Sequence, residues 1–364
     1  MSQHILVRLR NSRGRSYPIT IQTGLLRQVS KIIARGWRGS DVFIITDANV
    51  RRLYARLLLQ GLSAHKVNAR LLYFSAGEKS KNARVVSALH TQLLNQGIRR
   101  DSLIIALGGG VVGDVAGFVA ATVLRGVEYV QVPTTLLAQV DSSVGGKVGI
   151  DHQLGKNLIG AFHQPAAVFI DPNVLRTLPT AEFKNGLAEI VKIAAALDRK
   201  LFEKLERNAA RITRGSSRLL YSLIAESVRL KVAVVEKDEF ESGIRKTLNL
   251  GHTIGHAIEA ASDYGGKHGE AVAIGLAAEA KIAVELGLLT EDDYSSVLSL
   301  LHAFQLPTKF PHIKSRSKFL TALSADKKSE VDTTRFVLLK RIGHSVIGVD
   351  VPTPFLSELT GRSR

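Results

Sequence analysis

The chain has 364 residues, enough for two domains with a sizeable core in each, and a formal net charge of +17. It contains no cysteine, so disulfide bonds, thiolate metal sites and a cysteine nucleophile are excluded. Hydrophobic residues account for 45% and charged residues for 22%, which is ordinary for a globular protein.

The positive charge is spread along the chain. Basic pairs or clusters recur at Arg51-Arg52, Arg99-Arg100 and residues 199–218, and no aromatic-studded basic stripe accompanies them. This pattern favours a generally basic surface, able to attract anionic substrates, over nucleic-acid binding as the main function. The N-terminus alternates like a strand and lacks the apolar core of a signal peptide, and no apolar run reaches membrane-spanning length. We therefore expect a cytoplasmic, soluble protein without a membrane partner.

The N-terminal half alternates between strand and helix patterns. Residues 4–10 and 16–23 predict a hairpin, since both alternate and a turn-forming segment separates them. After the hairpin, apolar strands are expected at 41–46, 67–74, 102–107, 127–132 and 166–171, with a helix to about residue 60 and another over 83–96. This rhythm predicts an α/β domain over residues 1–178, with a parallel, Rossmann-like sheet covered by helices on both faces.

The third parallel strand leads directly into a glycine-rich turn. Gly108, Gly110 and Gly113 have the spacing of the dinucleotide fingerprint, in which glycines let the backbone approach a pyrophosphate at a helix start. No acidic residue ends a strand about 20 residues further on, so we do not expect the standard Rossmann binding mode. A tight turn without a ligand is the alternative. Asp47 and Asn49, after the first parallel strand, are better placed for a ribose or nicotinamide.

Two later segments carry groups suited to a phosphorylated ligand. The hydroxyls of Thr134 and Thr135, at the end of a strand, can contact phosphate or ribose. Residues 139–160 read as glycine-rich loops with two lysines and an asparagine, which suits an anion-binding surface. The alternative is a solvent-facing hairpin, which a buried-looking Asp141 near Lys147 makes less attractive.

From residue 180 onward the pattern is helical, so we place a mainly helical domain at 179–364. Helices are expected at 180–197, 199–209, 216–238, 245–261, 267–286 and 291–304. A short strand pair is expected at 335–342 and 345–349, followed by a helical C-terminus.

Histidines are concentrated between residues 252 and 268. In the expected helix 245–261, His252 and His256 lie on one face, and Arg245 and Asn249 continue that face. His268 starts the next helix after a glycine pair. Helical spacing by itself favours His252 with His256 as a metal pair, whereas ordinary surface histidines are the alternative.

A catalytic zinc site usually has three protein ligands and one open position. The best distant carboxylate is Glu189, which lies mid-helix between apolar residues, where an unpaired charge is costly. Lys192, one turn further on, shares its face. A Glu–Lys pair without a metal is the alternative.

These segments together resemble the 3-dehydroquinate synthases, a family of sugar-phosphate cyclases. The resemblance covers roughly Asp41 to Lys328, and its motifs run without a break at 108–114, 133–147, 186–192, 245–259 and 268–270. It implies conversion of 3-deoxy-D-arabino-heptulosonate 7-phosphate to 3-dehydroquinate and phosphate, in the shikimate pathway, by oxidation, phosphate elimination, reduction and an intramolecular aldol step. It also implies tightly bound NAD, a zinc or cobalt ion, and a homodimer.

The resemblance assigns roles to individual residues, and makes residues 1–178 the NAD-binding domain and 179–364 the metal- and substrate-binding domain. The metal ligands would be Glu189, His252 and His268. Spacing alone favoured His252 with His256, and the resemblance puts His268 in the place of His256. The NAD contacts would be Asp47, Asn49, Glu78, Lys81, Gly109, Gly110, Val111, Gly113, Asp114, Thr134, Thr135, Lys147, Lys156, Thr177, Leu178 and Glu182. The substrate contacts would be Asp141, Lys147, Asn157, Lys192, Lys231, Arg245, Asn249, His256 and one of Lys327 or Lys328, with Arg125 reaching the substrate phosphate of a partner subunit.

Three other functions remain open. Another sugar-phosphate cyclase of the same fold would act on a different sugar phosphate, although Asn249 and His256 match the dehydroquinate synthase pattern. A metal- and NAD-dependent polyol dehydrogenase would share the two-domain plan. A basic nucleic-acid-binding module is the alternative from another class.

Overall fold

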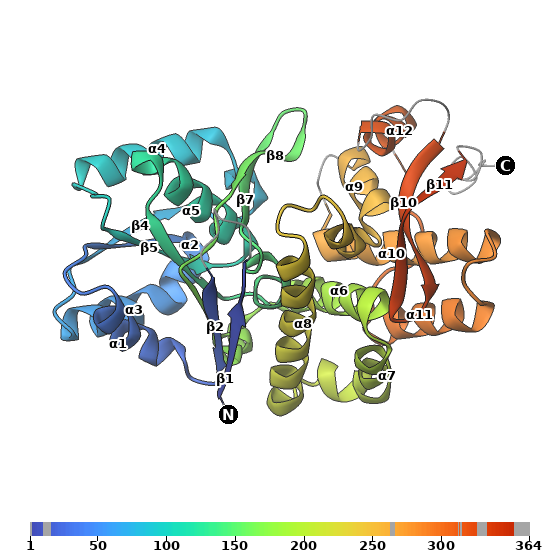
Figure 1. Ribbon diagram of the computed structural model, residues 1–364, viewed down its shortest axis with the longest axis horizontal. Coiled ribbons are helices and arrows are strands. Elements are labelled where there is room, and N and C mark those ends of the chain that lie inside the picture. Colours follow the sequence, from blue (N-terminus) through green and yellow to red (C-terminus); the bar gives the residue numbers. More distant parts are fainter. Residues whose placement is uncertain are drawn as a thin grey trace. The chain divides into compact units, whose positions relative to one another are not determined.

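The computed structural model describes residues 2–9, 16–262, 266–311, 313, 315–325 and 333–352. The chain divides into two compact units, residues 1–179 and 180–364, here called the N-terminal and C-terminal units (Figure 1). No helix among the described residues is long and apolar enough to cross a membrane.

The N-terminal unit contains the predicted alternation of strands and helices. Its strands are β1 (Ser2–Val7), β2 (Tyr17–Gln22), β3 (Val42–Asp47), β4 (Ala69–Phe74), β5 (Leu103–Gly108), β6 (Glu128–Pro133), β7 (Lys147–His152), β8 (Gly155–Phe162) and β9 (Ala167–Ile170). Its helices are α1 (Leu26–Gly36), α2 (Ala48–Val50), α3 (Arg56–Ala64), α4 (Ala83–Asn95) and α5 (Gly110–Thr122), with short 3₁₀ or π segments η1 (Arg51–Ala55), η2 (Glu78–Ser80), η3 (Val123–Arg125), η4 (Ala138–Ser142) and η5 (Pro172–Thr177).

Seven of these strands form one sheet, in the order β1-β2-β9-β6-β5-β3-β4. The β1–β2 pair is antiparallel and the remaining pairs are parallel. The predicted hairpin and the predicted parallel sheet are both confirmed. The carboxyl ends of parallel strands meet at one edge, which brings the segments after β3, β5 and β6 together.

Helices cover both faces of this sheet, and alternate residues of β3 show why. Phe43 and Ile45 belong to one hydrophobic core, with side chains of α4 and α5. Val42 and Ile44 belong to the other core, with side chains of α1 and α3. A strand buried on both faces is apolar at most positions, which explains the nearly continuous apolar runs in the sequence.

The segment 139–160 is a hairpin rather than the expected pair of loops. Strands β7 and β8 pair antiparallel. Val148 and Ile150 of β7 enter a hydrophobic core, whereas most side chains of β8 are exposed. Asp141 is half-buried and Lys147 is exposed, so the expectation of a buried Asp141 is only partly met.

The C-terminal unit is mainly helical, as predicted. Its helices are α6 (Thr180–Leu197), α7 (Arg199–Thr213), α8 (Ser217–Lys237), the 3₁₀ segment η6 (Ile244–Asn249), α9 (His252–Ala261), α10 (His268–Glu285), α11 (Glu291–Ala303) and α12 (Arg316–Ala325). The predicted strand pair is present as β10 (Thr333–Arg341) and β11 (His344–Pro352). Helix α12 was not expected from the sequence, and the expected C-terminal helix lies outside the described residues.

The prediction of one helix over 245–261 is wrong. Residues 244–249 form η6, and α9 begins only at His252. Between them Gly251 has a φ of +77°, in the left-handed region that ends helical continuity. A Cβ at Gly251 would lie 2.9 Å from the carbonyl oxygen of Val272, so no other residue fits without a shift. Contrary to the prediction from the sequence, Arg245 and Asn249 therefore do not share a helix face with His252 and His256.

Candidate functional site

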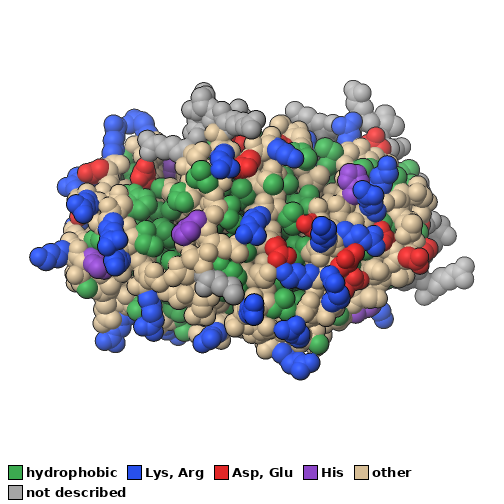
Figure 2. Space-filling model, turned by 60° about the horizontal axis from the view of Figure 1, so that its bottom comes forward, with side chains coloured by type: hydrophobic (Ala, Val, Ile, Leu, Met, Phe, Trp, Pro, Cys, Tyr) green, Lys and Arg blue, Asp and Glu red, His purple; other side chains and the backbone are tan. Residues whose placement is uncertain are grey.

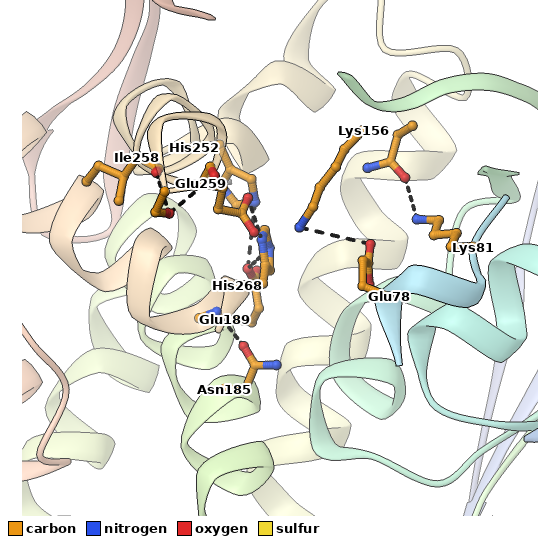
Figure 3. A network of polar contacts seen from close by, with 12 residues as sticks. Glu78, Lys81, Lys156, Asn185, Glu189, His252, Ile258, Glu259 and His268 are labelled. Carbon is orange, nitrogen blue, oxygen red and sulfur yellow. Dashed lines mark hydrogen bonds and ion pairs between the residues drawn. The ribbon is translucent and has the colours of Figure 1, made fainter. Parts of the chain in front are cut away.

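Three side chains from three helices meet in the C-terminal unit. Glu189 lies in the middle of α6, and His252 and His268 are the first residues of α9 and α10. Oε1 of Glu189 is 3.7 Å from Nε2 of His252 and 3.4 Å from Nε2 of His268. One ligand atom from each residue lies within 4.8 Å of the others (Figure 3). A single metal ion can be reached by all three.

Hydrogen bonds at the far side of each ring fix its orientation. Nδ1 of His252 lies 3.1 Å from the carbonyl oxygen of Leu250. Nδ1 of His268 lies 3.4 Å from Oε2 of the buried Glu259. Each Nδ1 faces one of these acceptors, so Nε2 is the ring atom that faces Glu189 and that can bind a metal once it is deprotonated.

Charges around Glu189 favour its ionised form. Burial raises the pKa of Glu189, but Lys192, with Nζ 2.6 Å from Oε2, and His268 outweigh burial and hold it well below its usual range. Burial and the nearby Lys192 lower the pKa of His252 to about 3. Burial also acts to lower the pKa of His268, but the neighbouring carboxylates of Glu189 and Glu259 raise it overall.

The residues present fit a bound divalent metal. Oε1 of Glu189 is buried and accepts no hydrogen bond of ordinary geometry from the described residues. A buried carboxylate oxygen without a donor is costly, and a cation would satisfy it. Two imidazoles and one carboxylate form a donor set suited to zinc or cobalt, with a position left open for another ligand.

His256, which spacing favoured as a ligand, lies beside this group. Its ring centroid is 5.1 Å from that of His252 and 6.1 Å from that of His268. A second possible ligand group consists of His256, Glu259 and His268, but Glu259 already accepts from His268. His256 is exposed at its position on α9, which leaves it available to a substrate.

The cationic residues expected to meet substrate are largely buried. Lys192, Lys231 and Arg245 each have 6% exposure or less. The Arg245 guanidinium donates to the carbonyl oxygen of Glu239. Asn249 donates through Nδ2 to Oε1 of Glu241 at 2.9 Å. Buried cations interact more strongly with an anion than exposed ones, because water screens them less.

Asp238 organises the turn that leads to Arg245. Its carboxylate accepts from the backbone N–H groups of Ser242, Gly243 and Arg245, at 2.9, 2.7 and 3.0 Å. Burial raises the pKa of Asp238, but these donors lower it overall. Sequence reasoning missed both Asp238 and Glu259. A signal for Glu259 was present, because it is a charged residue in an otherwise apolar helical segment.

In the N-terminal unit, five residues with predicted cofactor or substrate roles form one polar cluster. The buried Lys81 places Nζ 2.6 Å from Oδ2 of Asp114 and donates to Oδ1 of Asn157. Nζ of Lys156 lies 4.0 Å from Oε1 of Glu78 (Figure 3). Burial lowers the pKa of Lys81, but Asp114 and Glu78 raise it overall.

The glycine-rich turn places the start of α5 beside the end of β6. A Cβ at Gly113 would lie 2.7 Å from Oε1 of Gln131, and one at Gly109 would lie 2.8 Å from Cγ2 of Thr135. Oγ1 of Thr134 is buried without a hydrogen-bond partner among the described residues. The N–H of Thr134 donates to the carbonyl oxygen of Gly108, two residues before α5, at 2.8 Å. A helix start, whose first N–H groups have no acceptor within the helix, is suited to bind a phosphate.

Other predicted residues occupy more varied positions. Asp47 accepts from the N–H groups of Asn49 and Val50, so its carboxylate caps α2. Oγ1 of Thr177 is 2.5 Å from the hydroxyl of Tyr54. The remaining predicted residues in this unit are the half-buried Gly110, Val111 and Leu178, and the exposed Arg125.

Arg125 has a φ of +66°, which is strained for a residue with a side chain.

Glu182, expected to contact the cofactor, belongs to the C-terminal unit, and its Oε1 pairs with Nζ of Lys267 at 2.5 Å. Lys327 and Lys328 lie outside the described residues.

Comparison with solved structures defines the class of fold. A 2-epi-5-epi-valiolone synthase from Streptomyces hygroscopicus subsp. jinggangensis 5008, solved with NAD+ and Zn2+ bound, is 29% identical with a TM-score of 0.88, covering 97% of this chain and 98% of that one. A 2-deoxy-scyllo-inosose synthase in complex with carbaglucose-6-phosphate, NAD+ and Co2+ is 28% identical with a TM-score of 0.88 and 99% of both chains covered. The structure thus has the fold of the sugar-phosphate cyclases. A probable glycerol dehydrogenase from Sinorhizobium meliloti 1021 shares the fold alone, at 15% identity and a TM-score of 0.64 over 94% of each chain.

Within this class, sequence comparison defines the family. The model of the 3-dehydroquinate synthase N-terminal region matches residues 71–185, and that of the C-terminal region matches residues 186–329. A 3-dehydroquinate synthase from Pelobacter propionicus is 45% identical over 348 residues, which are 95% of this chain and 96% of the relative. One from Prochlorococcus marinus (strain MIT 9215) is 43% identical over 342 residues, which are 93% and 94%. The chain belongs to the 3-dehydroquinate synthase family.

Proposed function

We propose that the protein converts 3-deoxy-D-arabino-heptulosonate 7-phosphate to 3-dehydroquinate and phosphate, with NAD and a zinc or cobalt ion. The observation that carries this proposal is the convergence of Glu189, His252 and His268, in a chain of this family, around a buried carboxylate oxygen to which no described residue donates a hydrogen bond. Solved relatives with NAD+ and Zn2+ or Co2+ bound support the choice of cofactors.

The bound groups and the chain divide the chemistry between them. When bound, NAD would accept and return a hydride, and the metal would lower the pKa of the reacting alcohol. Glu189, His252 and His268 would hold the metal. Glu78, Lys81, Asp114 and Lys156 would hold NAD together with the turn at Gly109 and Gly110 and the hydroxyls of Thr134 and Thr135. The remaining NAD contacts would be Asp47, Asn49, Val111, Gly113, Lys147, Thr177, Leu178 and Glu182.

Cationic side chains would hold the two anionic ends of the substrate. Buried Lys192, Lys231 and Arg245, with exposed Lys147, would neutralise a phosphate and a carboxylate. The phosphate can take the proton whose loss drives its own elimination, so no strong protein base is required at that step. The final aldol step is intramolecular, and the protein's part is to hold the ring-opened intermediate in one conformation.

We further propose that the enzyme acts in the shikimate pathway, in the cytoplasm, as a homodimer. In the dimer, Arg125 would reach the substrate phosphate of the partner subunit. Its exposed position and left-handed backbone support a role outside its own unit, because a strained conformation is kept where the side chain has a function.

Phosphate release tests the proposal directly. The purified protein should release phosphate from the heptulosonate phosphate, lose this activity on treatment with a chelator, and regain it with zinc or cobalt. Phosphate release from glucose 6-phosphate, or turnover of sedoheptulose 7-phosphate, would indicate another sugar-phosphate cyclase. Accumulation of NADH with glycerol would indicate a polyol dehydrogenase. Absence of phosphate release from the metal-loaded protein would refute the proposed reaction.

Two variants test the assigned substrate pocket. Arg245→Ala and Lys192→Ala should lower kcat/KM by roughly 10²-fold or more, because each removes a buried charge complementary to the substrate. NAD and metal should remain bound. Arg335→Ala, which removes an exposed arginine paired with Asp350, is the matched control and should keep full activity.

A further inference from the structure

Both histidine-bearing helices begin without a capping side chain of their own. The residue before α9 is Gly251 and the residue before α10 is Lys267, and neither makes a side-chain capping hydrogen bond. The first N–H groups of a helix have no partner within it, so buried ones need acceptors from elsewhere. Here the acceptors come from neighbouring helices.

Helix α9 is capped by Glu279 of α10. This side chain is fully buried, and its carboxylate accepts from the N–H of Gly251 at 2.5 Å and from the N–H of Ile254 at 3.2 Å. Gly275 brings α10 close to the same turn, since a Cβ there would lie 2.0 Å from the carbonyl oxygen of Gly251. His252 lies between the two capped N–H groups, so its backbone position is fixed against α10.

Helix α10 is capped in turn by Asn185 of α6. Oδ1 of Asn185 accepts from the N–H of Gly269, the residue after His268 (Figure 3). Nδ2 of Asn185 donates to Oε2 of Glu182 at 3.2 Å. A Cβ at Gly269 would lie 2.5 Å from the backbone oxygen of Asn185, so the two helices touch at this point. Asn185 stands one helical turn before Glu189 on α6.

We propose that Asn185 and Glu279 are positioning residues that hold the two histidines in metal-binding geometry relative to Glu189. Asn185 joins α6 to α10, and Glu279 joins α10 to α9, so the caps connect all three ligand-bearing helices. Ligand atoms must reach about 2.0–2.2 Å from a zinc ion, and small displacements of a ligand-bearing helix weaken binding. This inference rests on the proposed function, because it presumes that the three side chains bind a metal.

Cobalt binding tests the inference without an activity measurement. The metal-free protein is titrated with Co2+ in competition with a chelator, and the visible absorption bands report the geometry of coordination. Asn185→Ala and Glu279→Gln should weaken Co2+ binding by about 10- to 100-fold and change the bands, as expected when groups that support metal ligands are removed. Asn185→Asp keeps an oxygen acceptor, so it should lose less Co2+ affinity than Asn185→Ala.

A matched control separates positioning from general stability. Thr290 caps α11, which carries no predicted ligand, by accepting from the N–H of Asp293 at 3.2 Å. Thr290→Ala should lower the melting temperature but leave Co2+ affinity and the bands unchanged. If the Asn185 and Glu279 variants behave like Thr290→Ala, the inference is overturned.

Two further measurements complete the test. Should a variant fail to fold, as judged by circular dichroism, Glu279→Asp is measured in its place; its carboxylate is one methylene too short, and unaltered Co2+ binding would overturn the inference. Failure of the proposed metal site would look different: the unaltered protein would bind no Co2+, or Glu189→Ala would bind it equally well.

Discussion

At the scale of single residues, the buried charges around Arg245 show how the C-terminal unit accommodates a cation in its interior. Arg245 is 2% exposed, donates to the carbonyl oxygen of Glu239 and lies in a turn held by Asp238. The turn uses a carboxylate as a common acceptor for several N–H groups, which is stronger than a neutral acceptor. Asp238 therefore supports both the fold and the position of a proposed substrate-binding residue.

Replacement of Asp238 should lower stability in a pH-dependent way. Asp238→Asn should reduce the free energy of unfolding by about 1–3 kcal/mol at pH 7, since three backbone N–H groups, of which that of Arg245 is buried, lose a charged acceptor. The pKa of Asp238 is lower in the folded protein than its usual 3.8, so the carboxylate's contribution is present above that value and is lost as pH falls through the folded pKa. Urea unfolding at several pH values measures the difference.

The exposed Asp101, with a side chain 67% exposed, provides the control. Asp101→Asn should change stability by less than about 0.5 kcal/mol. A loss for Asp238→Asn that stays constant down to the lowest pH would contradict the role assigned to its ionised form.

At the scale of elements, α9 and α10 pack closely because glycines line their contact. A Cβ at Gly251, just before α9, would lie 2.9 Å from backbone of α10, and a Cβ at Gly275 would lie 2.0 Å from the carbonyl oxygen of Gly251, so neither position has room for one. A Cβ at Gly255 would lie 3.1 Å from the carbonyl oxygen of Ala271, which is a tight contact. Both predicted histidine ligands lie at the starts of these helices. The close contact therefore sets the distance between the two imidazoles.

A methyl group at Gly275 should force the two helices apart. Gly275→Ala should lower the free energy of unfolding by roughly 1–3 kcal/mol, because overpacking outweighs the gain of about 1 kcal/mol in helix propensity. It should also weaken metal binding. Gly36→Ala is the control, since a Cβ at the end of α1 meets nothing within 4 Å. Thermal unfolding and a metal titration measure both effects. Unchanged stability and metal affinity in Gly275→Ala would show that the contact between α9 and α10 is looser than described.

At the scale of the whole molecule, the chain carries a formal net charge of +17. Figure 2 shows Lys and Arg side chains spread across one face rather than gathered in a stripe. A distributed positive field acts on any anion that approaches, and salt screens it.

The charge should therefore affect substrate capture. Raising ionic strength from about 0.01 to 0.15 M should lower kcat/KM by roughly 3- to 10-fold, because the Debye length falls from about 30 to 8 Å. The value of kcat should change much less, since buried cations are screened weakly. Steady-state kinetics in increasing salt measures this, and a salt-independent kcat/KM would exclude electrostatic attraction.

The proposed dimer can be tested through shared sites. Arg125→Ala and Lys192→Ala should each be inactive alone. In a mixed dimer, one site combines an intact Lys192 with an intact Arg125 from the partner, so subunit exchange should restore about a quarter of the normal activity. Measuring phosphate release before and after mixing checks this. No recovery, with mixed dimers present, would show that Arg125 does not act across subunits.

The sequence by itself determined much of this protein. Apolar runs at 41–46 and 102–107 specified buried parallel strands, and helical periodicity specified most of the C-terminal unit, because burial imposes these patterns locally. The resemblance in its motifs named Glu189, His252 and His268 before any geometry was known. Spacing favoured His256 as a ligand, because residues four apart share a helix face. That argument takes no account of which other helix lies against the face.

Only the tertiary structure decided how these groups meet. The break at Gly251 depends on the backbone of α10, and the caps from Asn185 and Glu279 join helices distant in sequence. Local patterns report which face of a segment is buried, but not which neighbour covers it. Contacts between distant segments arise from packing in three dimensions, so the position of each imidazole could be read only from the folded chain.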